Sequence, residues 1–284
     1  MSDILEPKYH LENESFSIQF MRRTGFSSMA TAHAHSFYEI YYLRKGERVY
    51  FLNGKVYTVK SGDMIVINPN DVHRTASSTV PEFERVLINF THEFIKQHLS
   101  SNLNVLPFQQ GSQIIRFPVE KQSQIERTVF EMLKECKHER PGYLDYTKAL
   151  LSELLIEIYR QSFQSSPEIH HPMHEKISEI ATYLQQHYND NVTLQNIAEQ
   201  FYISPSYLSR TFKKVTGFYF NEYIQAVRMR EARRQLIETD EKILNISVNV
   251  GFHSIAHFNK TFKKMSNLTP MQFRKQNKHL SSKH

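Results

Sequence analysis

The spacing of apolar residues changes along the chain, from every second residue to every third or fourth residue. Between residues 16 and 90, apolar residues alternate with polar ones or form short runs of aromatic and branched side chains, which is typical of β-strands. From about residue 120 onward, apolar residues recur at intervals of three and four, which predicts helices. Because the strands precede the helices along the chain, the predicted fold class is α+β.

The strand region also contains turn signals. The expected strands cover residues 16–20, 39–43, 49–52, 64–67 and 86–90. Asn53 and Gly54 lie between two of these runs and form the strongest short hairpin signal, and Gly62 lies in a second turn. Short strands with turns about every ten residues predict an antiparallel barrel or jelly roll.

Two helices are expected directly after the strands. One apolar stripe joins Ile125 to Cys136 and a second joins Leu144 to Ile158, with Gly142 in the break between them. The short connection predicts an antiparallel pair, which either packs on the barrel or pairs between subunits. Cys136 is the one cysteine of the chain, so no disulfide and no cysteine zinc site is expected, and its place on the stripe predicts a small buried residue.

The C-terminal part predicts a duplicated helix-turn-helix arrangement. Capping residues and apolar stripes place helices at about residues 177–184, 194–201, 205–216, 220–238, 242–250, 255–265 and 271–274. Ser204 and Ser254 are the expected N-caps of the helices that follow them, and Gly217 is an expected left-handed C-cap. A supporting helix, a turn and a second helix therefore occur twice, at about residues 193–214 and 242–265.

The second helix of each unit contains the same four residues, Thr-Phe-Lys-Lys, at positions 211–214 and 261–264. The positions that helical spacing turns inward are Leu208, Phe212, Val215, Phe258, Phe262 and Met265. The lysines then face outward, where we expect them to hold phosphates. The residues just before them differ between the two copies, so we expect two different half-contacts with DNA.

The outward face of each second helix supplies the predicted DNA contacts. These candidates are Ser206, Tyr207, Ser209, Arg210, Lys213 and Lys214 in the first unit and Ile255, Ala256, Asn259, Lys260 and Lys263 in the second. Arg210 is the best base reader because its guanidinium matches O6 and N7 of guanine. Asn259 could pair with adenine and Lys260 with guanine. Ile255 or Ala256 could contact a thymine methyl group.

The helix expected at residues 220–238 connects the two units without a break. At 1.5 Å per residue it spans about 28 Å. One turn of B-DNA is ~34 Å, which is the usual spacing of two reading elements on one face. The connecting helix could therefore hold both second helices against successive major grooves.

The charge distribution suggests a nucleic-acid-binding C-terminal part, although charge alone fits a soluble basic helical domain about equally well. Residues 173–284 hold 16 lysines and arginines against 9 acidic residues, whereas residues 1–172 hold 19 against 20. The net charge of +6 therefore comes from the C-terminal part, as is typical of a DNA-binding domain joined to a neutral one. No segment approaches the ~18 apolar residues of a membrane span, and the N-terminus lacks a signal-peptide pattern. A cytoplasmic protein with no membrane partner is expected.

A group of histidines and an acidic residue stands out among the strands. His33, His35 and Glu39 share one face of an extended strand by parity, and His73 follows the run at 64–67. Three histidines and one carboxylate suit Zn, Fe or Mn. At these residues the sequence resembles the cupin superfamily. In the second cupin motif, however, Pro69 stands one position late and an aspartate replaces the usual glycine.

Two interpretations of this histidine group remain open. It is either a metal centre, such as that of a metal-dependent cupin enzyme, or the small-molecule site of a sensor barrel, and the C-terminal part favours the sensor. Under the sensor interpretation we expect no metal and no cofactor. The expected effector-binding residues are His33, His35, Glu39, Tyr41, Asn68 and His73. Arg22, Arg23 and Arg44 could meet an anionic or polyol ligand, but solvated surface charges are the more ordinary interpretation.

Residues 177–275 resemble the DNA-binding domain of the AraC/XylS family. The matching segments are 194–198, 204–217, 228–232, 250–252, 258–264 and 269–274. Ser247 stands in place of the usual alanine and Asn267 in place of the usual glycine. The upstream strands and helix pair are similar to the sensor half of the same family.

The resemblance implies a bacterial transcription regulator that is not an enzyme, and more often an activator than a repressor. It implies a sugar or related metabolite as effector, and a homodimer that acts with RNA polymerase on double-stranded promoter DNA. The expected organisation is a cupin-like antiparallel β-barrel with two following helices over residues 1–162, a linker over 163–172, and an all-α double helix-turn-helix domain over 173–284. The linker prediction rests on its polar, proline-containing sequence.

Overall fold

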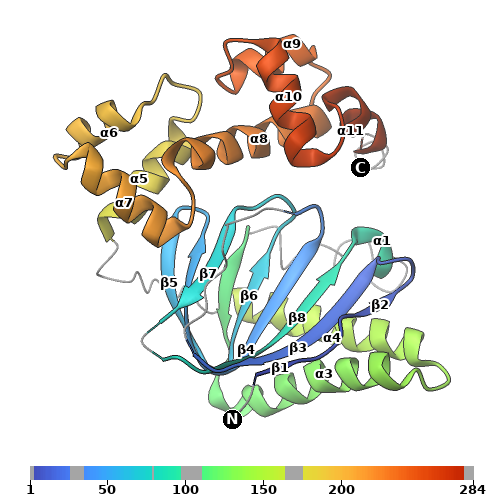
Figure 1. Ribbon diagram of the computed structural model, residues 1–284. Coiled ribbons are helices and arrows are strands. Elements are labelled where there is room, and N and C mark those ends of the chain that lie inside the picture. Colours follow the sequence, from blue (N-terminus) through green and yellow to red (C-terminus); the bar gives the residue numbers. More distant parts are fainter. Residues whose placement is uncertain (1–2, 26–34, 79, 97–110, 164–174, 278–284) are drawn as a thin grey trace. The chain divides into compact units, whose positions relative to one another are not determined.

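The structure of the protein is a computed structural model that describes residues 3–25, 35–78, 80–96, 111–163 and 175–277 (Figure 1). The chain divides into two compact units, residues 1–173 and 174–284. The first unit contains the strands and two long helices, and the described part of the second contains helices joined by turns. Apart from its first residue, the predicted linker lies outside the described residues.

An antiparallel sheet forms the first unit. Its strands are β1 (Ile4–Leu5), β2 (Tyr9–Leu11), β3 (Phe16–Arg23), β4 (Tyr38–Leu52), β5 (Lys55–Lys60), β6 (Asp63–Ile67), β7 (His73–Ser77), β8 (Phe83–Phe90) and β9 (Gln113–Arg116). The strand order is β1-β3-β8-β4-β6-β9, with β2 beside β3 and with β5 and β7 beside β4. The prediction of an antiparallel β fold is confirmed. Within the described residues, however, the strand path has two ends, so the sheet is open and jelly-roll-like rather than a closed barrel.

Strand β4 organises this sheet. The sequence predicted two strands at 39–43 and 49–52, but β4 runs through both as one strand of 15 residues. Its first half pairs with β6 and β8, and its second half pairs with β5 and β7, so β4 passes from one layer to the other. Gly46 lies at the crossing with φ +96°, and a Cβ there would lie 2.3 Å from the carbonyl oxygen of Glu82. Only glycine fits this position.

Alternation along the strands gives the sheet two different faces. One face, which includes Ile40 and Ile88, packs in one core with α3 (Val119–His138) and α4 (Tyr143–Ser162). The other face, which includes Tyr41, forms the interior between the two layers. The helix pair therefore packs on the sheet of its own chain, which was one of the two sequence alternatives.

Two smaller features of the first unit agree with this packing. The short helix α1 (His92–Ile95) follows β8 and buries Phe94 in the core that lies under α3 and α4. Cys136 on α3 is buried as predicted, and burial raises the pKa of its thiol to about 11. A thiol that stays protonated at neutral pH is a packing residue rather than a nucleophile.

The second unit contains two helix-turn-helix motifs and a connecting helix. Its helices are α5 (Glu175–Gln186), α6 (Leu194–Gln200), α7 (Pro205–Thr216), α8 (Phe220–Glu238), α9 (Ile243–Asn249), α10 (Ile255–Ser266) and α11 (Pro270–Asn277). The predicted boundaries are confirmed to within a few residues, and α11 is longer than expected. No helix in the described segments is both long and apolar enough to span a bilayer.

The predicted helix caps explain why the boundaries fall where they do. The side chains of Thr193, Ser204 and Ser254 each accept a hydrogen bond from a backbone N–H in the first turn of the helix that follows. Gly217 ends α7 with φ 82°, and Asn267 ends α10 with φ 55°. Asparagine tolerates this left-handed conformation, so it replaces the usual glycine without loss of the cap.

One inward prediction is wrong. Met265 is 36% exposed, whereas the other five predicted inward positions on α7 and α10 are buried. The core at this end of α10 is formed by Phe262, Leu268 and Phe273 instead. The chain turns back after Ser266, and the residues that follow the helix take the space that helical spacing assigned to Met265.

Candidate effector-binding and DNA-binding sites

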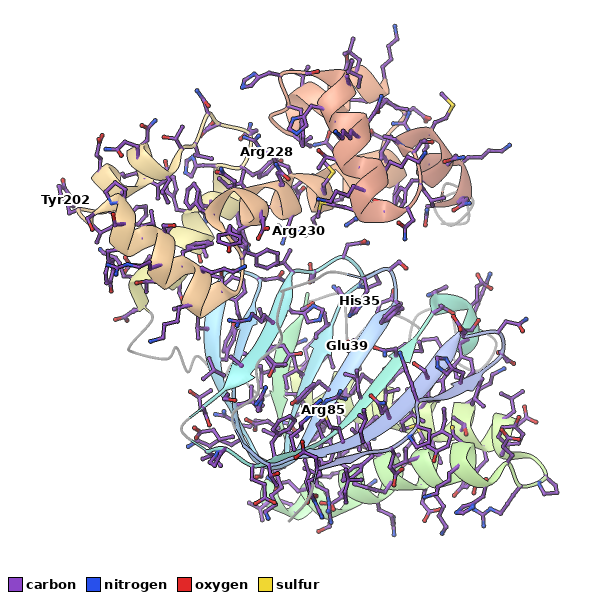
Figure 2. The ribbon with its side chains drawn as sticks, in the orientation of Figure 1. His35, Glu39, Arg85, Tyr202, Arg228 and Arg230 are labelled. Carbon is purple, nitrogen blue, oxygen red and sulfur yellow. The ribbon has the colours of Figure 1, made fainter. Side chains whose placement is uncertain are left out.

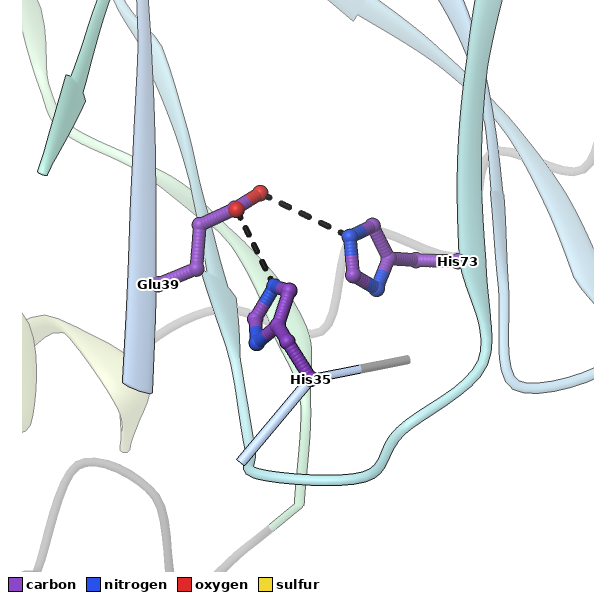
Figure 3. Close-up of side chains that lie close together, drawn as sticks. All are labelled: His35, Glu39 and His73. Carbon is purple, nitrogen blue, oxygen red and sulfur yellow. Dashed lines mark hydrogen bonds and ion pairs between the residues drawn. The ribbon is translucent and has the colours of Figure 1, made fainter. Parts of the chain in front are cut away.

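The carboxylate of Glu39, near the start of β4, lies between two histidines (Figure 3). His35 Nε2 lies 3.1 Å from Glu39 Oε2, and His73 Nε2 lies 3.7 Å from Glu39 Oε1. One ligand atom from each of the three residues lies within 4.8 Å of the other two. Glu39 and His73 are buried, so these charges and dipoles act on one another with little screening by water.

Backbone carbonyls orient both imidazole rings. His35 Nδ1 lies 2.9 Å from the carbonyl oxygen of Phe37, and His73 Nδ1 lies 3.0 Å from that of Asp71. A protonated Nδ1 donates to each carbonyl, which leaves Nε2 of both rings facing the Glu39 carboxylate. This arrangement suits either an imidazolium–carboxylate pair or two neutral nitrogens and one carboxylate oxygen around a cation. The same polar atoms could also hold the hydroxyl groups of a ligand.

The remaining predicted effector residues differ in their placement. His33 lies outside the described residues. Tyr41 lies two residues after Glu39 on the same face of β4, and is fully buried in the interior. Asn68 follows β6, whose last residue pairs with Glu39, and its backbone N–H donates to Ser112 Oγ at 2.7 Å. The structure therefore brings His35, Glu39 and His73 together and leaves Asn68 at the edge of the same end of the sheet.

The interior contains further polar residues that the sequence interpretation missed. They are Arg48, Tyr50, Thr75, Arg85 and Asn89, which come from β4, β7 and β8. Strand pairing places Asn89 opposite Glu39 and Arg85 opposite Leu43. Figure 2 shows Glu39 and His35 toward one end of the sheet and Arg85 farther along the interior. Local parity could not have found them: a register shift after Leu43 reverses the parity of Arg48 and Tyr50 relative to Glu39, and Arg85 and Asn89 are placed only by the register that joins β4 to β8.

Two arginines that the sequence offered for an anionic ligand have another role. Arg22 Nη2 and Arg44 Nη1 each lie 2.6 Å from the carboxylate of Glu84. Burial tends to raise the pKa of Glu84, but hydrogen bonds from Arg44 and Arg22 outweigh it and lower the pKa. These three residues form a structural ion-pair network across β3, β4 and β8.

The predicted DNA-reading residues lie on the outer faces of α7 and α10. Ser206, Arg210 and Lys214 are exposed on α7, and Tyr207 is half exposed, whereas Ser209 and Lys213 are half buried. All five candidates on α10 are exposed: Ile255, Ala256, Asn259, Lys260 and Lys263. Phe212, Phe258 and Phe262 are fully buried beneath them. The repeated segment thus has the predicted division between core phenylalanines and outward lysines.

The two copies hold their first repeated lysine differently. Lys213 Nζ lies 3.9 Å from the ring centroid of Tyr219 and 3.9 Å from Glu222 Oε2. Fifty positions later, Lys263 is exposed and threonine stands where the first copy has Tyr219. The ammonium group of Lys213 is therefore held toward α8, whereas that of Lys263 projects into solvent.

A groove lies between α9, α10 and the start of α11. It has a volume of about 470 Å³ and is lined by Ile243, Leu244, Ile255, Asn259, Lys260, Lys263, Thr269, Pro270 and Met271. Four predicted DNA contacts on α10 lie in this lining together with exposed apolar side chains of α9 and α11. An apolar reading surface suits contact with thymine methyl groups and sugars more than with phosphates.

Arg228 of α8 joins the two motifs (Figure 2). Its Nε donates to the carbonyl of Tyr188 at 2.7 Å and its Nη2 donates to that of Asp190 at 3.0 Å. A Cβ at Gly251, in the second motif's turn, would lie 2.9 Å from the Arg228 guanidinium and 3.0 Å from Asn189 Cα. The loop before α6 and the turn after α9 therefore pack on one side chain, which fixes the first motif against the second.

Comparison with known protein families identifies both units. The chain matches an AraC-like ligand binding domain over residues 24–155 and a helix-turn-helix domain over residues 197–276. The chain belongs to the AraC/XylS family of transcriptional regulators. This AraC-family regulator therefore contains a ligand-binding domain of the AraC type in its sheet unit and a helix-turn-helix domain in its helical unit.

Similar proteins are named as transcriptional regulators. The transcriptional activator RhaS of Escherichia coli is 25% identical over 85% of this chain and 86% of its own length. The HTH-type transcriptional regulator YisR of Bacillus subtilis is 25% identical over 84% of this chain and 86% of its own. ToxT of Vibrio cholerae, a solved structure, aligns with 93% of this chain and 98% of its own at 15% identity and a TM-score of 0.38. The named relatives favour a regulator over an enzyme.

Proposed function

We propose that this regulator activates transcription by binding promoter DNA through both helix-turn-helix motifs, and that a small carbohydrate-like metabolite bound in the sheet interior controls the binding. The observation that carries the proposal is the paired reading surface on α7 and α10, with basic and polar side chains outside and buried phenylalanines inside. Helix α8 is 19 residues long, which is about 28 Å at 1.5 Å per residue. That length suits two recognition helices in successive major grooves.

The proposal gives the outward residues separate roles. Arg210 reads guanine, Asn259 reads adenine, and Lys260 reads guanine, because their side chains match the donor and acceptor pattern of those bases. Lys214 and Lys263 hold phosphates, which position the protein without specifying sequence. Tyr207, Ser206, Ser209, Ile255 and Ala256 complete the two contact surfaces, and Lys213 adds a weaker phosphate contact.

The sheet unit is proposed to sense the effector and to pair two chains into a homodimer. His35, Glu39, Tyr41 and His73 would contact the metabolite, with His33 and Asn68 as further candidates. The proposed boundaries are a sensing unit at 1–162, a linker at 163–172 and a DNA-binding unit at 173–284. RNA polymerase would be the partner at an activated promoter. The supporting observations are the buried polar group at one end of the sheet and the name of the relative RhaS, a transcriptional activator.

Footprinting of the full-length protein on its own upstream DNA tests the proposal. We expect one short protected site with two half-contacts about one helical turn apart. Arg210→Ala should weaken binding to this site by about 1–3 kcal/mol and relax one base position. If the same loss occurs on every sequence, Arg210 contacts phosphate rather than a base. If no discrete site is protected, the proposed promoter binding is wrong.

A metal-dependent enzyme is the second candidate, because the donor atoms of His35, Glu39 and His73 are close enough to share one cation. Two imidazole nitrogens and one carboxylate oxygen, with His33 as a possible fourth ligand, would suit Zn, Fe or Mn. Elemental analysis of the purified protein decides between the candidates. Stoichiometric metal that is lost in His35→Ala and His73→Ala would favour the metal centre. Metal-free protein that still protects its DNA site would favour the sensor.

A further inference from the structure

Two arginine side chains reach the interior of the sheet unit, and no carboxylate of the described residues pairs with either of them. Arg48 is 2% exposed; its Nε donates to Thr75 Oγ1 at 3.1 Å and its Nη1 donates to Ser77 Oγ at 3.3 Å. Its guanidinium carbon lies 4.1 Å from the ring centroid of Phe83. Hydroxyl groups and an aromatic ring stabilise the guanidinium but do not neutralise it, so its charge remains in a buried interior.

The second guanidinium, that of Arg85, lies near the first. Arg85 contacts the ring of Tyr41, with 5.7 Å from its guanidinium carbon to the ring centroid. Its Nη1 is buried and makes no hydrogen bond with any described residue. Burial lowers the pKa of Arg48, and the positive charge of Arg85 lowers it further. The two cations therefore repel each other, and within the described segments neither forms an ion pair with a carboxylate that could supply two acceptor oxygens.

The opposite end of the same interior offers acceptors. Asn89 lies opposite Glu39 in the β4–β8 ladder, and its Oδ1 is buried without a hydrogen-bond partner among the described residues. The Glu39 carboxylate adds two further acceptor oxygens there. Arg85 lies four ladder positions away, opposite Leu43, which is roughly 13 Å along the strands. The interior thus has a cationic end and an acceptor end, which suit an anion and hydroxyl groups respectively.

Resting on the effector binding proposed above, we propose that the sheet interior binds a hydroxylated anion, a sugar acid or a sugar phosphate, whose carboxylate or phosphate is held by Arg48 and Arg85. The guanidinium forks donate to the anionic oxygens, and Glu39 and Asn89 accept from the hydroxyl groups. A neutral sugar would leave both cations uncompensated and would therefore bind more weakly.

Differential scanning calorimetry of the full-length protein tests the anion site without knowledge of the effector. The midpoint of unfolding is measured in chloride, in acetate and in inorganic phosphate at one ionic strength, for the wild type and for Arg85→Met. We expect acetate or phosphate to raise the wild-type midpoint by about 2–4 °C relative to chloride. A larger rise in acetate would identify a carboxylate as the preferred group, and a larger rise in phosphate would identify a phosphate. Arg85→Met should lose this response.

Two further variants make the result decisive. Arg127→Met removes an exposed arginine of α3 and should keep the whole anion response. Arg85→Lys keeps a cation and should keep part of it, which guards against a folding failure of Arg85→Met. Equal anion responses in the wild type, Arg85→Met and Arg127→Met would show a general salt effect and overturn the proposal. An unresponsive wild type would overturn it as well.

The outcome is independent of the DNA experiment. An anion response that requires Arg85, in a protein that protects no DNA site, would retain the anion site and reject the proposed promoter binding. Promoter binding without an Arg85-dependent anion response would retain the proposed promoter binding and reject the anion site. Gluconate and glucose 6-phosphate, compared with glucose in the same calorimetric assay, then test the hydroxylated part of the ligand in either case.

Discussion

At the scale of single residues, the turns of the two motifs reach a left-handed backbone conformation with different residues. Tyr202 and Gly251 both follow a supporting helix, with φ values of 54° and 84°. Gly251 has no room for a Cβ, because Arg228 and Asn189 lie against it. Tyr202 is 94% exposed and adopts a left-handed conformation that costs about 1–2 kcal/mol for a residue with a Cβ. An exposed, strained aromatic residue just before α7 suggests a functional contact rather than a packing one.

Replacement of Tyr202 should separate stability from DNA binding. Tyr202→Gly relieves the backbone strain, and we expect the free energy of unfolding to rise by about 1 kcal/mol. We also expect weaker DNA binding on all sequences alike, because an exposed tyrosine beside the recognition helix would contact the sugar–phosphate backbone. Chemical denaturation and DNA titration measure the two effects. Lower stability, or unchanged DNA affinity, would contradict this interpretation.

The lowered pKa of Glu84 predicts that the sheet unit loses stability in acid. Its pKa is lowered in the folded protein, so its contribution to stability is present above the unfolded pKa and is lost as the pH falls through the folded value. We expect Glu84→Gln to lower the free energy of unfolding by about 1–3 kcal/mol at neutral pH, because Arg22 and Arg44 lose their carboxylate. Denaturation between about pH 3 and pH 7 should show the difference narrowing in acid. A difference that is constant with pH would contradict the ion-pair mechanism.

At the scale of secondary structure, local signals predicted the helices well and the sheet less completely. Caps at Ser204 and Ser254 and the break at Gly217 depend on neighbouring residues only, so the sequence contained the information. The union of two predicted strands into β4 depends on its pairing with β5, β6, β7 and β8, and only the hairpin to β5 is encoded by a local pattern. For the same reason, His35 and Glu39 could be grouped by parity, whereas Arg85 could not be assigned to their interior before the register of β8 was known.

Arg228 on α8 contacts both the loop before α6 and the turn after α9, so one side chain can fix the position of one motif against the other. Arg228→Met would remove the side-chain donor from the carbonyls of Tyr188 and Asp190, although the carbonyl of Asp190 also accepts from the backbone N–H of Val192. We expect a loss of about 1–3 kcal/mol in the free energy of unfolding. The variant should lose more affinity for DNA that contains the half-sites of both motifs than for DNA that contains one half-site. The reason is that the two motifs must be held in register to bind together. Arg234→Met is the matched control, since Arg234 lies on the same helix and its ion pairs within the described residues are with Glu231 and Glu238.

The Arg228 experiment uses binding titrations on the two DNA lengths. An equal loss on both would mean that Arg228 stabilises the fold without coupling the motifs. A loss of similar size in Arg234→Met would mean that removal of any positive charge from α8 explains the effect.

At the scale of the whole molecule, charge is distributed so that only the helical unit is basic. The excess of lysine and arginine in residues 173–284 gives this unit a favourable interaction with any DNA, which must fall as salt is added. The sheet unit is nearly neutral, yet it buries the Arg48 side chain and the Nη1 atom of Arg85, and no carboxylate among the described residues pairs with either. We therefore infer two uses of positive charge: a solvated surface that attracts a polyanion, and an interior pair that selects one small anion.

The salt dependence of DNA binding should distinguish the two repeated lysines. Each phosphate contact contributes about 0.9 to the slope of log K against log salt concentration. Lys263→Ala should lower the slope by about one and weaken specific and nonspecific DNA alike, because Lys263 is exposed. Lys213→Ala should lower it by less, because its ammonium group already contacts the Tyr219 ring and lies near Glu222. Binding titrations from about 50 to 200 mM salt measure both slopes. Equal slopes in the two variants would show that Lys213 leaves the Tyr219 ring and contacts a phosphate when DNA binds. An unchanged slope in Lys263→Ala would show that Lys263 does not contact a phosphate.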